Sequence, residues 1–450
     1  MATTALPKAS VRAKVSLAAI LALPSFTVVV AFCVRVLFCL LSHRFEDTGR
    51  GELTAIGKEA GLLALSLATG KGFSNPFPGY DTATAWLAPG FPALWSIAFR
   101  IFPSSATWGP WYFCQMMNSA FSAFTCWPIY WLGKRVFSFR VGVAAAWTWV
   151  FLPLAILFPL EWVWDQSLSA LLLALLLCAT YRMREAPSAS MAWAGFGLLW
   201  GGAALVNPTL CVLLPFLLGW IVFCRWRSGV RSFRPVLKLA LFLLLAVLPW
   251  TARNYFALDG FVPIKSNFGV ELWLGNNAAV TTGVFSPQIH PMNNLPELML
   301  LIVSGEPNYT RAKQRAALAF IRANPKRFAQ LVGRRVTDTW AGLYDSREDK
   351  WMSVLHLRTA EIYFCVVLSA FAAAGLVVAL RRNAVEALPL ALCVVVFPVP
   401  YYLTHTSLRY RHPIDPVLTL FAVYAAAQII SALASTRRTA PSLPDAHPAS

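Results

Sequence analysis

The chain has 450 residues, of which 58% are hydrophobic and 13% are charged, and its mean hydropathy is +0.58. Soluble domains are about 45–50% apolar and about 25% charged, so this composition excludes a soluble globular enzyme. Nine cysteines in 450 residues are also too few for a disulfide-stapled scaffold. The composition therefore predicts a multi-span membrane protein with a water-exposed portion.

Ten apolar stretches approach the roughly 20 residues that a helix needs to cross a bilayer. The first is too long for the apolar core of a signal peptide and no Ala-x-Ala cleavage site follows it, so we expect a retained helix. The segment 91–102 is apolar but short, which fits an interfacial or re-entrant helix better than a crossing. The ten predicted spans are residues 15–41, 109–133, 141–160, 166–181, 191–206, 208–224, 236–251, 361–380, 387–403 and 414–434.

Basic residues set the orientation, because Lys and Arg in short loops remain on the cytoplasmic side. A ten-span arrangement puts the basic clusters inside, and Glu185, Glu386 and Asp445 are the acids it leaves on that side. Both termini are therefore predicted to be cytoplasmic, in the inner (plasma) membrane. The net charge of +18 follows largely from this bias, and without a basic face interleaved with aromatics we expect no nucleic-acid partner. The clusters lie at residues 8–14, 134–140, 182–184, 225–238, 381–382 and 437–438.

The predicted fold class is an all-α polytopic membrane protein with about ten transmembrane helices, juxtamembrane helices on the outer face and a small extracytoplasmic α+β domain. That domain is expected at 252–360, where 253–277 has turn and strand-like character and 309–335 has helical periodicity. The other parts are a cytoplasmic N-terminus (1–14), a transmembrane module (15–251) with a large first outer loop (42–108), C-terminal transmembrane helices (361–434) and a disordered cytoplasmic tail (435–450).

Carboxylates gather in the predicted outer loops. A carboxylate at a membrane boundary costs free energy unless it has a partner or faces water, so such residues are functional candidates. The alternative is that loop acids are simply solvated, and that interpretation is favoured for Glu46, Asp47 and Glu52. Glu59 and Asp165 have apolar neighbours, which favours a function for both.

The last predicted outer loop, 404–415, contains two arginines and two histidines on the side that avoids basic residues. Arginine offers forked donors to phosphate oxygens, so Arg409 and Arg411, with Tyr410 and His412, predict an anionic ligand. An interfacial belt is the alternative. Arg35 lies inside the first span, where it either snorkels outward or pairs with an acid or a ligand phosphate.

Metal and nucleotide motifs are absent from the sequence. It contains no His-x-x-x-His pair, no Cys-x-x-Cys and no phosphate-binding loop of the Walker type, so we predict no dedicated metal site and no ATP-driven transport. An acidic cluster in the outer loops could still hold Mg²⁺ or Mn²⁺.

Several motifs on the predicted outer face resemble those of GT-C membrane glycosyltransferases, and in particular of glycosyltransferase family 39, which is related to protein O-mannosyltransferases and the lipid A aminoarabinose transferase. The resemblance implies a GT-C-like catalytic module and transfer of a sugar from a polyprenyl-phosphate carrier to a protein, lipid or glycan on the non-cytoplasmic face. It covers most of the chain from Glu59 to Tyr424, through the segments 59–77, 84–92, 162–165, 249–254, 267–277 and 409–413.

The resemblance also implies roles for individual residues. An acid in the first outer loop acts as base, with a second acid in the next loop, so Glu59 and Asp165 are the expected catalytic residues. Many relatives have an Asp-Glu pair where this chain has Lys58-Glu59, which makes Asp47 the substitute base. The motif residues Arg253 and Asn276 are expected to bind substrate.

Two other functions remain open from the residues alone. A secondary transporter or flippase would favour paired repeats and charges at mid-bilayer, yet apart from Arg35 the spans nearly lack charges. A non-catalytic scaffold would not need acids and arginines gathered on one face.

Overall fold

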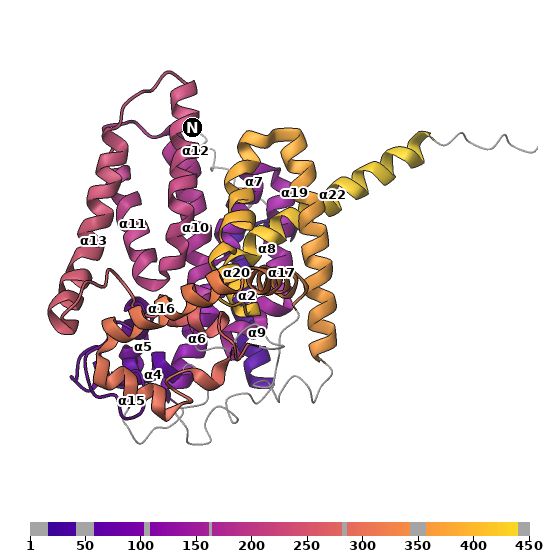
Figure 1. Ribbon diagram of the computed structural model, residues 1–450. Coiled ribbons are helices and arrows are strands. Elements are labelled where there is room, and N and C mark those ends of the chain that lie inside the picture. The colour runs from indigo at the N-terminus through magenta and orange to yellow at the C-terminus, as the bar shows by residue number, and fades with distance from the viewer. Residues whose placement is uncertain are drawn as a thin grey trace, which may run out of the picture.

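The structure, a computed structural model, describes residues 17–41, 58–102, 109–161, 164–280, 286–342 and 357–439. Across these ranges the regular structure is helical, and β pairing is limited to one isolated antiparallel bridge between Ser74 and Ala83. Figure 1 shows α10, α11, α12 and α13 standing upright, with the helices α4, α5, α15 and α16 gathered below them.

The helices of the first half, in chain order, are α1 (Leu17–Leu21), α2 (Pro24–Leu41), α4 (Lys58–Ala68), α5 (Gly90–Ile101), α6 (Gly109–Phe124), α7 (Cys126–Val136), α8 (Phe139–Phe151), α9 (Pro153–Glu161), α10 (Gln166–Glu185), α11 (Ala192–Val206), η1 (Pro208–Leu213) and α12 (Leu214–Arg227). Those of the second half are α13 (Arg234–Leu258), α14 (Phe268–Gly275), η2 (Pro287–Ile289), α15 (Leu295–Ser304), α16 (Glu306–Ala323), α17 (Pro325–Ala341), α19 (Leu357–Val396), α20 (Val399–Leu403), α21 (Leu408–Arg411), η3 (His412–Ile414) and α22 (Asp415–Thr439).

Six of the described helices are long and apolar enough to cross a membrane, or seven if the bent pair α8–α9 forms one span. The chain is thus a multi-pass membrane protein by its helices, although fewer of them meet this criterion than the ten that the sequence predicts. One of the six contains both limbs of α19, whose backbone leaves helical geometry at Asn383. Figure 1 shows these limbs folded back on each other, so the predicted spans 361–380 and 387–403 form a hairpin.

Two predicted spans are broken helices. The segment 109–133 divides at Thr125 into α6 and α7, and 141–160 divides at Leu152 into α8 and α9, which meet at a bend of 46°. Pro153 explains the second break, because a proline disfavours helical geometry in the residue before it and supplies no N–H group.

Pro153 and Pro159 have no N–H groups for the carbonyls of Trp149 and Ala155, four residues before them, and the buried Arg35 satisfies these carbonyls instead. Its guanidinium donates to the carbonyls of Ala155 (3.0 Å) and Trp149 (3.3 Å) and to the Ser122 hydroxyl (3.0 Å). Arg35 therefore does not snorkel outward, and its hydrogen bonds among the described residues go to carbonyls and a hydroxyl rather than to an acid. Its side chain holds the bend.

In the predicted α+β domain, the regular structure of the described residues between 252 and 342 is helical, with turns and irregular segments between the helices. The strand-like segment 253–277 forms the end of α13, a turn and α14. Helix α14 fits between neighbours because a side chain at Gly269 would collide with the carbonyl of Thr310 in α16, and one at Gly275 with the carbonyl of Thr404. Tertiary packing of a Gly-bearing apolar segment thus selects helix over strand.

Candidate functional site

Polar side chains from distant parts of the chain meet at the end of the bundle where α10 begins, which we call the site end. The contributing elements are the start of α4, the residues before α10, the segment around α14, and the loop that leads into α21. Apolar residues such as Phe77, Trp86 and Val270 pack beneath this region and fix these elements relative to one another.

Two side chains, Glu306 and Arg253, attach the segment 73–85 to the rest of the site end. The buried carboxylate of Glu306 accepts hydrogen bonds from the backbone N–H of Ala85 (2.9 Å) and from the Thr84 hydroxyl. Arg253 donates to the carbonyls of Thr84 (2.6 Å) and Phe73 (2.7 Å). Arg253 therefore secures this segment, and its expected contact with substrate stays a prediction.

Arg409 begins a chain of polar contacts across the site. Its Nη2 donates to the Tyr410 hydroxyl (3.1 Å), which lies 3.2 Å from Nε2 of His405. Because the phenol oxygen accepts from Arg409, we assign its own O–H as the donor to His405. Nδ1 of His405 lies 3.5 Å from Oε2 of Glu271, in the first turn of α14.

The surroundings of this row of polar contacts place Arg409 against aromatic rings and keep His405 neutral. The Arg409 guanidinium lies over the rings of Trp164 and Tyr410, at 5.0 Å from each centroid, which are cation–π distances. Burial, together with the positive charges of Arg409 and Arg335, lowers the pKa of His405 to about 3. The imidazole is therefore a weak base at neutral pH, and it lies within hydrogen-bonding distance of Tyr410 and 3.5 Å from the carboxylate of Glu271.

Asp165 lies directly before α10, within the electrostatic influence of Lys265 and Arg409. Its Oδ2 accepts a hydrogen bond from the Ser169 hydroxyl (2.8 Å), which in turn accepts one from the side-chain amide of Asn207 (3.2 Å). Burial raises the pKa of Asp165, while the Ser169 hydrogen bond and the charges of Lys265 and Arg409 act in the opposite direction. The site thus brings a carboxylate and two cations together at a membrane boundary, as a charged ligand would require.

Glu59 lies in the first turn of α4, where the helix dipole favours a negative charge. Its Oε1 is 3.8 Å from Nε2 of His290, and the Glu59 side chain is 12% exposed. Nδ1 of His290 accepts a hydrogen bond from the backbone N–H of Met292 (3.2 Å), so we assign the imidazole proton to Nε2, facing Glu59. The rings of Phe77 and Trp86 pack edge-on against His290, each at 5.7 Å, and hold this orientation.

The structure therefore brings together three of the predicted residues, Asp165, Arg409 and Tyr410, and places Glu59 close enough for its charge to act on Tyr410. It adds four residues that the sequence did not single out. Glu271 and His405 lie inside segments that the analysis flagged, whereas Lys265 precedes a motif by two residues. His290 carried no sequence signal.

Arg411 and His412 lie elsewhere, in a fully buried cluster around Asp415. Nε of Arg411 is 3.0 Å from Oδ1 of Asp415, and Nδ1 of His412 is 3.0 Å from Oδ2. Arg411 also donates to the Ser369 hydroxyl (3.2 Å), and the His412 ring stacks on Trp149 at 5.6 Å. The geometry does not bring either side chain to Arg409, so their predicted contact with a phosphate has no support from this arrangement.

The side chain of Asn276 is buried and makes hydrogen bonds within the protein. Its amide donates to the carbonyl of Leu403 (2.9 Å) and its oxygen accepts from the buried Arg335 (3.3 Å), which links α14, α17 and α20. Asp47, the predicted substitute base, lies outside the described residues, as do Glu46 and Glu52 of the same loop. Among the residues that the structure describes, no group of three His, Cys, Asp or Glu side chains is placed to hold a metal ion.

Comparison with known proteins addresses the fold. No protein-family model and no curated protein matches the sequence. Solved structures do match in three dimensions: the oligosaccharyltransferase of Archaeoglobus fulgidus superposes with a TM-score of 0.54 at 15% identity in its apo form, over 92% of this chain and 51% of that one. The chain has the fold of an oligosaccharyltransferase. It spans about half of that protein's length.

Two further structures of the same archaeal enzyme agree. The complex with zinc and sulfate has a TM-score of 0.52 at 16% identity and covers 90% of this chain and 49% of that one. The form tethered to an acceptor peptide with an NVT sequon also has a TM-score of 0.52, at 15% identity, and covers 95% and 52%. These comparisons show a fold shared with this archaeal enzyme. The narrower resemblance to family 39 and to the aminoarabinose transferase stays a prediction.

Proposed function

We propose that this protein is a membrane glycosyltransferase that moves a sugar from a polyprenyl-phosphate carrier to a protein, lipid or glycan acceptor on the non-cytoplasmic face. One observation carries the proposal: the carboxylates of Glu59 and Asp165 and the cations Arg409 and Lys265 gather at one end of a fold shared with an oligosaccharyltransferase. Charges of both signs at a membrane boundary suit a reaction in which a base activates a hydroxyl and a phosphate departs.

The proposed reaction needs no nucleotide, because the lipid phosphate is the leaving group. The Glu59 carboxylate takes the proton of the acceptor hydroxyl, whose oxygen forms a bond to the anomeric carbon. The bond from that carbon to the phosphate oxygen breaks, and its electron pair stays on the phosphate. Arg409 and Lys265 offset the charge that develops there. Attack opposite to the leaving group inverts the anomeric centre.

The second carboxylate, Asp165, has a distinct part in this proposal. It lies among Arg409, Lys265 and Ser169, so it holds the two cations in place and is itself stabilised as an anion by them. His290 is a positioning residue, because its Nε2–H faces Glu59 while Phe77 and Trp86 fix its ring. The reaction therefore assigns separate tasks to the two acids, with Glu59 as the base.

The experiment uses the full chain, purified and reconstituted in vesicles with a panel of polyprenyl-phosphate-linked sugars and of hydroxyl-bearing peptide, lipid and glycan acceptors, and it measures the release of polyprenyl phosphate. Glu59→Gln keeps the size and hydrogen bonding of the side chain but removes the base, and Asp81→Asn changes an exposed acid of the same loop as a matched control. We expect release with the wild type and the control, but not with Glu59→Gln. Translocation of a lipid-linked sugar without release would establish the flippase alternative instead.

A further inference from the structure

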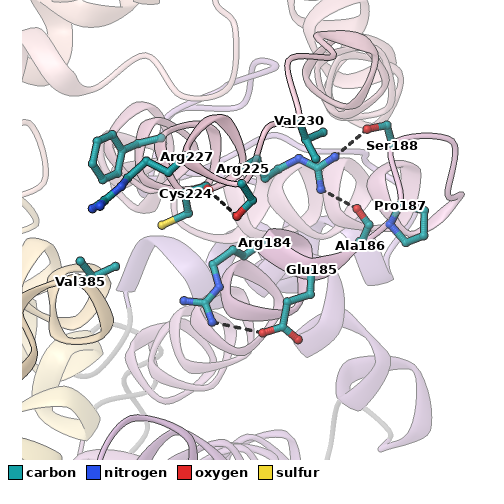
Figure 2. A pocket seen from close by; sticks show the side chains of 12 residues that line it. Arg184, Glu185, Ala186, Pro187, Ser188, Cys224, Arg225, Arg227, Val230 and Val385 are labelled. Carbon is teal, nitrogen blue, oxygen red and sulfur yellow. Dashed lines mark hydrogen bonds and ion pairs between the residues drawn. The ribbon is translucent and has the colours of Figure 1, made fainter.

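A cavity of about 700 Å³ lies at the end of the bundle opposite the site end. It is enclosed by the end of α10, the turn after it, the end of α12 and Val385 in the second limb of α19, as Figure 2 shows. Helix α10 begins beside Asp165 and ends at Glu185 in the cavity wall, and its 20 residues span about 30 Å at 1.5 Å per residue. The cavity is thus separated from the candidate site by about the thickness of a bilayer core.

The wall of this cavity is positively charged. It contains Arg184, Arg225 and Arg227 and one acid, Glu185. Ligand pockets of 300–1,000 Å³ are typical, so a volume of about 700 Å³ is enough for a headgroup with its phosphate. An anion is therefore the ligand that the lining favours.

Two of the three arginines are held in fixed positions. Arg225 donates to the Ala186 carbonyl (2.5 Å) and the Ser188 hydroxyl (2.6 Å), as seen in Figure 2, and it stacks on Trp193 at 5.3 Å. Arg184 is paired with Glu386 and Glu185. A guanidinium carries five N–H groups, so these contacts orient each side chain and leave N–H groups for another acceptor. Such preorganised donors bind a phosphate at little entropic cost.

The surroundings favour a lipid over a soluble anion. The lining residue Phe223 is 47% exposed and Trp226, three residues further along α12, is 58% exposed, so the cavity lies beside an apolar helix face with an aromatic residue typical of the membrane interface. The sequence also concentrates cations at this end, including the exposed Arg231 and Arg234. Basic pockets between transmembrane helices on such a face are suited to anionic headgroups.

We propose that this cavity binds the phosphate headgroup of an anionic phospholipid from the adjoining leaflet. Arg225 and Arg184 bind the phosphate oxygens, and the acyl chains lie along α12 past Phe223. The proposal is independent of the activity at the site end, since none of its residues belongs to that site.

The test compares lipid retention by the purified full chain in a neutral detergent, measured by native mass spectrometry. Phosphatidylglycerol is compared with phosphatidylcholine of the same acyl chains, and inorganic phosphate serves as the soluble competitor. Arg184→Gln combined with Arg225→Gln removes the donors. Because Arg225 also holds the turn at Ser188, a second variant, Ser228→Trp, fills the cavity and leaves both arginines in place. Arg382→Gln changes an exposed cation at the same end that does not line the cavity.

We expect selective retention of phosphatidylglycerol by the wild type and by Arg382→Gln, and at least about tenfold weaker retention by the other two variants, in line with the loss of charge-assisted contacts. Equal retention of the two lipids, or equal retention by Ser228→Trp and the wild type, would overturn the proposal. Displacement of the lipid by millimolar inorganic phosphate would also overturn it, because the cavity would then be a site for a soluble anion.

Discussion

Replacing Arg409 should weaken binding of the sugar donor while the protein remains folded. The guanidinium is half-buried between two aromatic rings and donates a hydrogen bond to Tyr410. In Arg409→Ala the lost interaction with a donor phosphate is a hydrogen bond to a charged group, which contributes about 1.5–3 kcal/mol. Donor affinity should therefore fall by about 10- to 150-fold, since 1.4 kcal/mol corresponds to a factor of ten. Arg409→Lys should recover little, because an ammonium lacks the planar fork and its stacking.

Arg411→Ala should have the opposite result. Arg411 is fully buried and paired with Asp415, and removing one partner of a buried ion pair costs about 3–5 kcal/mol because the other charge is left without compensation. We expect a lower thermal midpoint and less folded protein, with the remaining folded fraction binding donor normally. The two arginines, two residues apart, thus serve as matched controls for each other.

The measurement is a titration of the purified proteins with a polyprenyl-phosphate-linked sugar, with the thermal midpoint of each variant recorded in the same detergent. If Arg409→Ala keeps the wild-type donor affinity while it remains folded, Arg409 is an interfacial residue and not a phosphate ligand. If Arg411→Ala instead weakens donor binding at an unchanged midpoint, the assignment of the two arginines is reversed.

Four further outcomes follow from the same geometry. Glu59→Gln should accumulate normally and bind donor but lose turnover by about 10²–10⁴-fold, the usual loss with a general base, and near wild-type turnover would place the base elsewhere. Turnover should decline as the pH is lowered through the pKa of Asp165, which lies above that of an ordinary aspartate. Lys265→Met removes a charge that lowers this pKa, so it should move the decline to higher pH. An unchanged pH profile would contradict the electrostatic coupling between Lys265 and Asp165. Arg35→Met should destabilise the fold by about 1.5–3 kcal/mol in thermal or denaturant unfolding, since the α8–α9 carbonyls lose a charged donor, whereas a negligible change would mean that the bend is held otherwise. In a background without other cysteines, Arg322→Cys in α16 should react with an impermeant maleimide in intact cells and Ser228→Cys should not, and the reverse pattern would invert the proposed topology.

The helices were predictable because apolar runs in a bilayer have few alternatives, since every backbone polar group must be satisfied within the segment. The interruptions were less predictable. Pro153 marks the bend between α8 and α9, but Thr125 carries no comparable signal for the break between α6 and α7. The segment at Phe268–Gly275 was predicted as strand-like, and it is helical because close contacts at its glycines with Thr310 and Thr404 decide its conformation. Such contacts cannot be recognised in a local pattern.

The site was predictable in part for a similar reason. Glu59, Asp165 and Arg409 stand out because they are charged residues beside apolar segments. His290 and Lys265 become relevant only when the fold brings them to partners more than 90 residues away in sequence, at Glu59 and Asp165 respectively. No spacing rule connects residues at such separations.

Sequence position also could not show that Arg409 and Arg411 have different partners. Helix geometry explains why they do. Residues two apart on a helical turn do not face the same side. In α21 one arginine therefore meets Trp164 and Tyr410 at the site, while the other turns inward to Asp415. The preference for basic residues on the cytoplasmic side makes every arginine in the opposite loops a candidate. Burial and partners then sort the candidates: Arg253 is committed to backbone carbonyls and Arg411 to a buried carboxylate, so among the motif arginines it is Arg409, half-exposed beside Asp165, whose surroundings fit an anionic ligand.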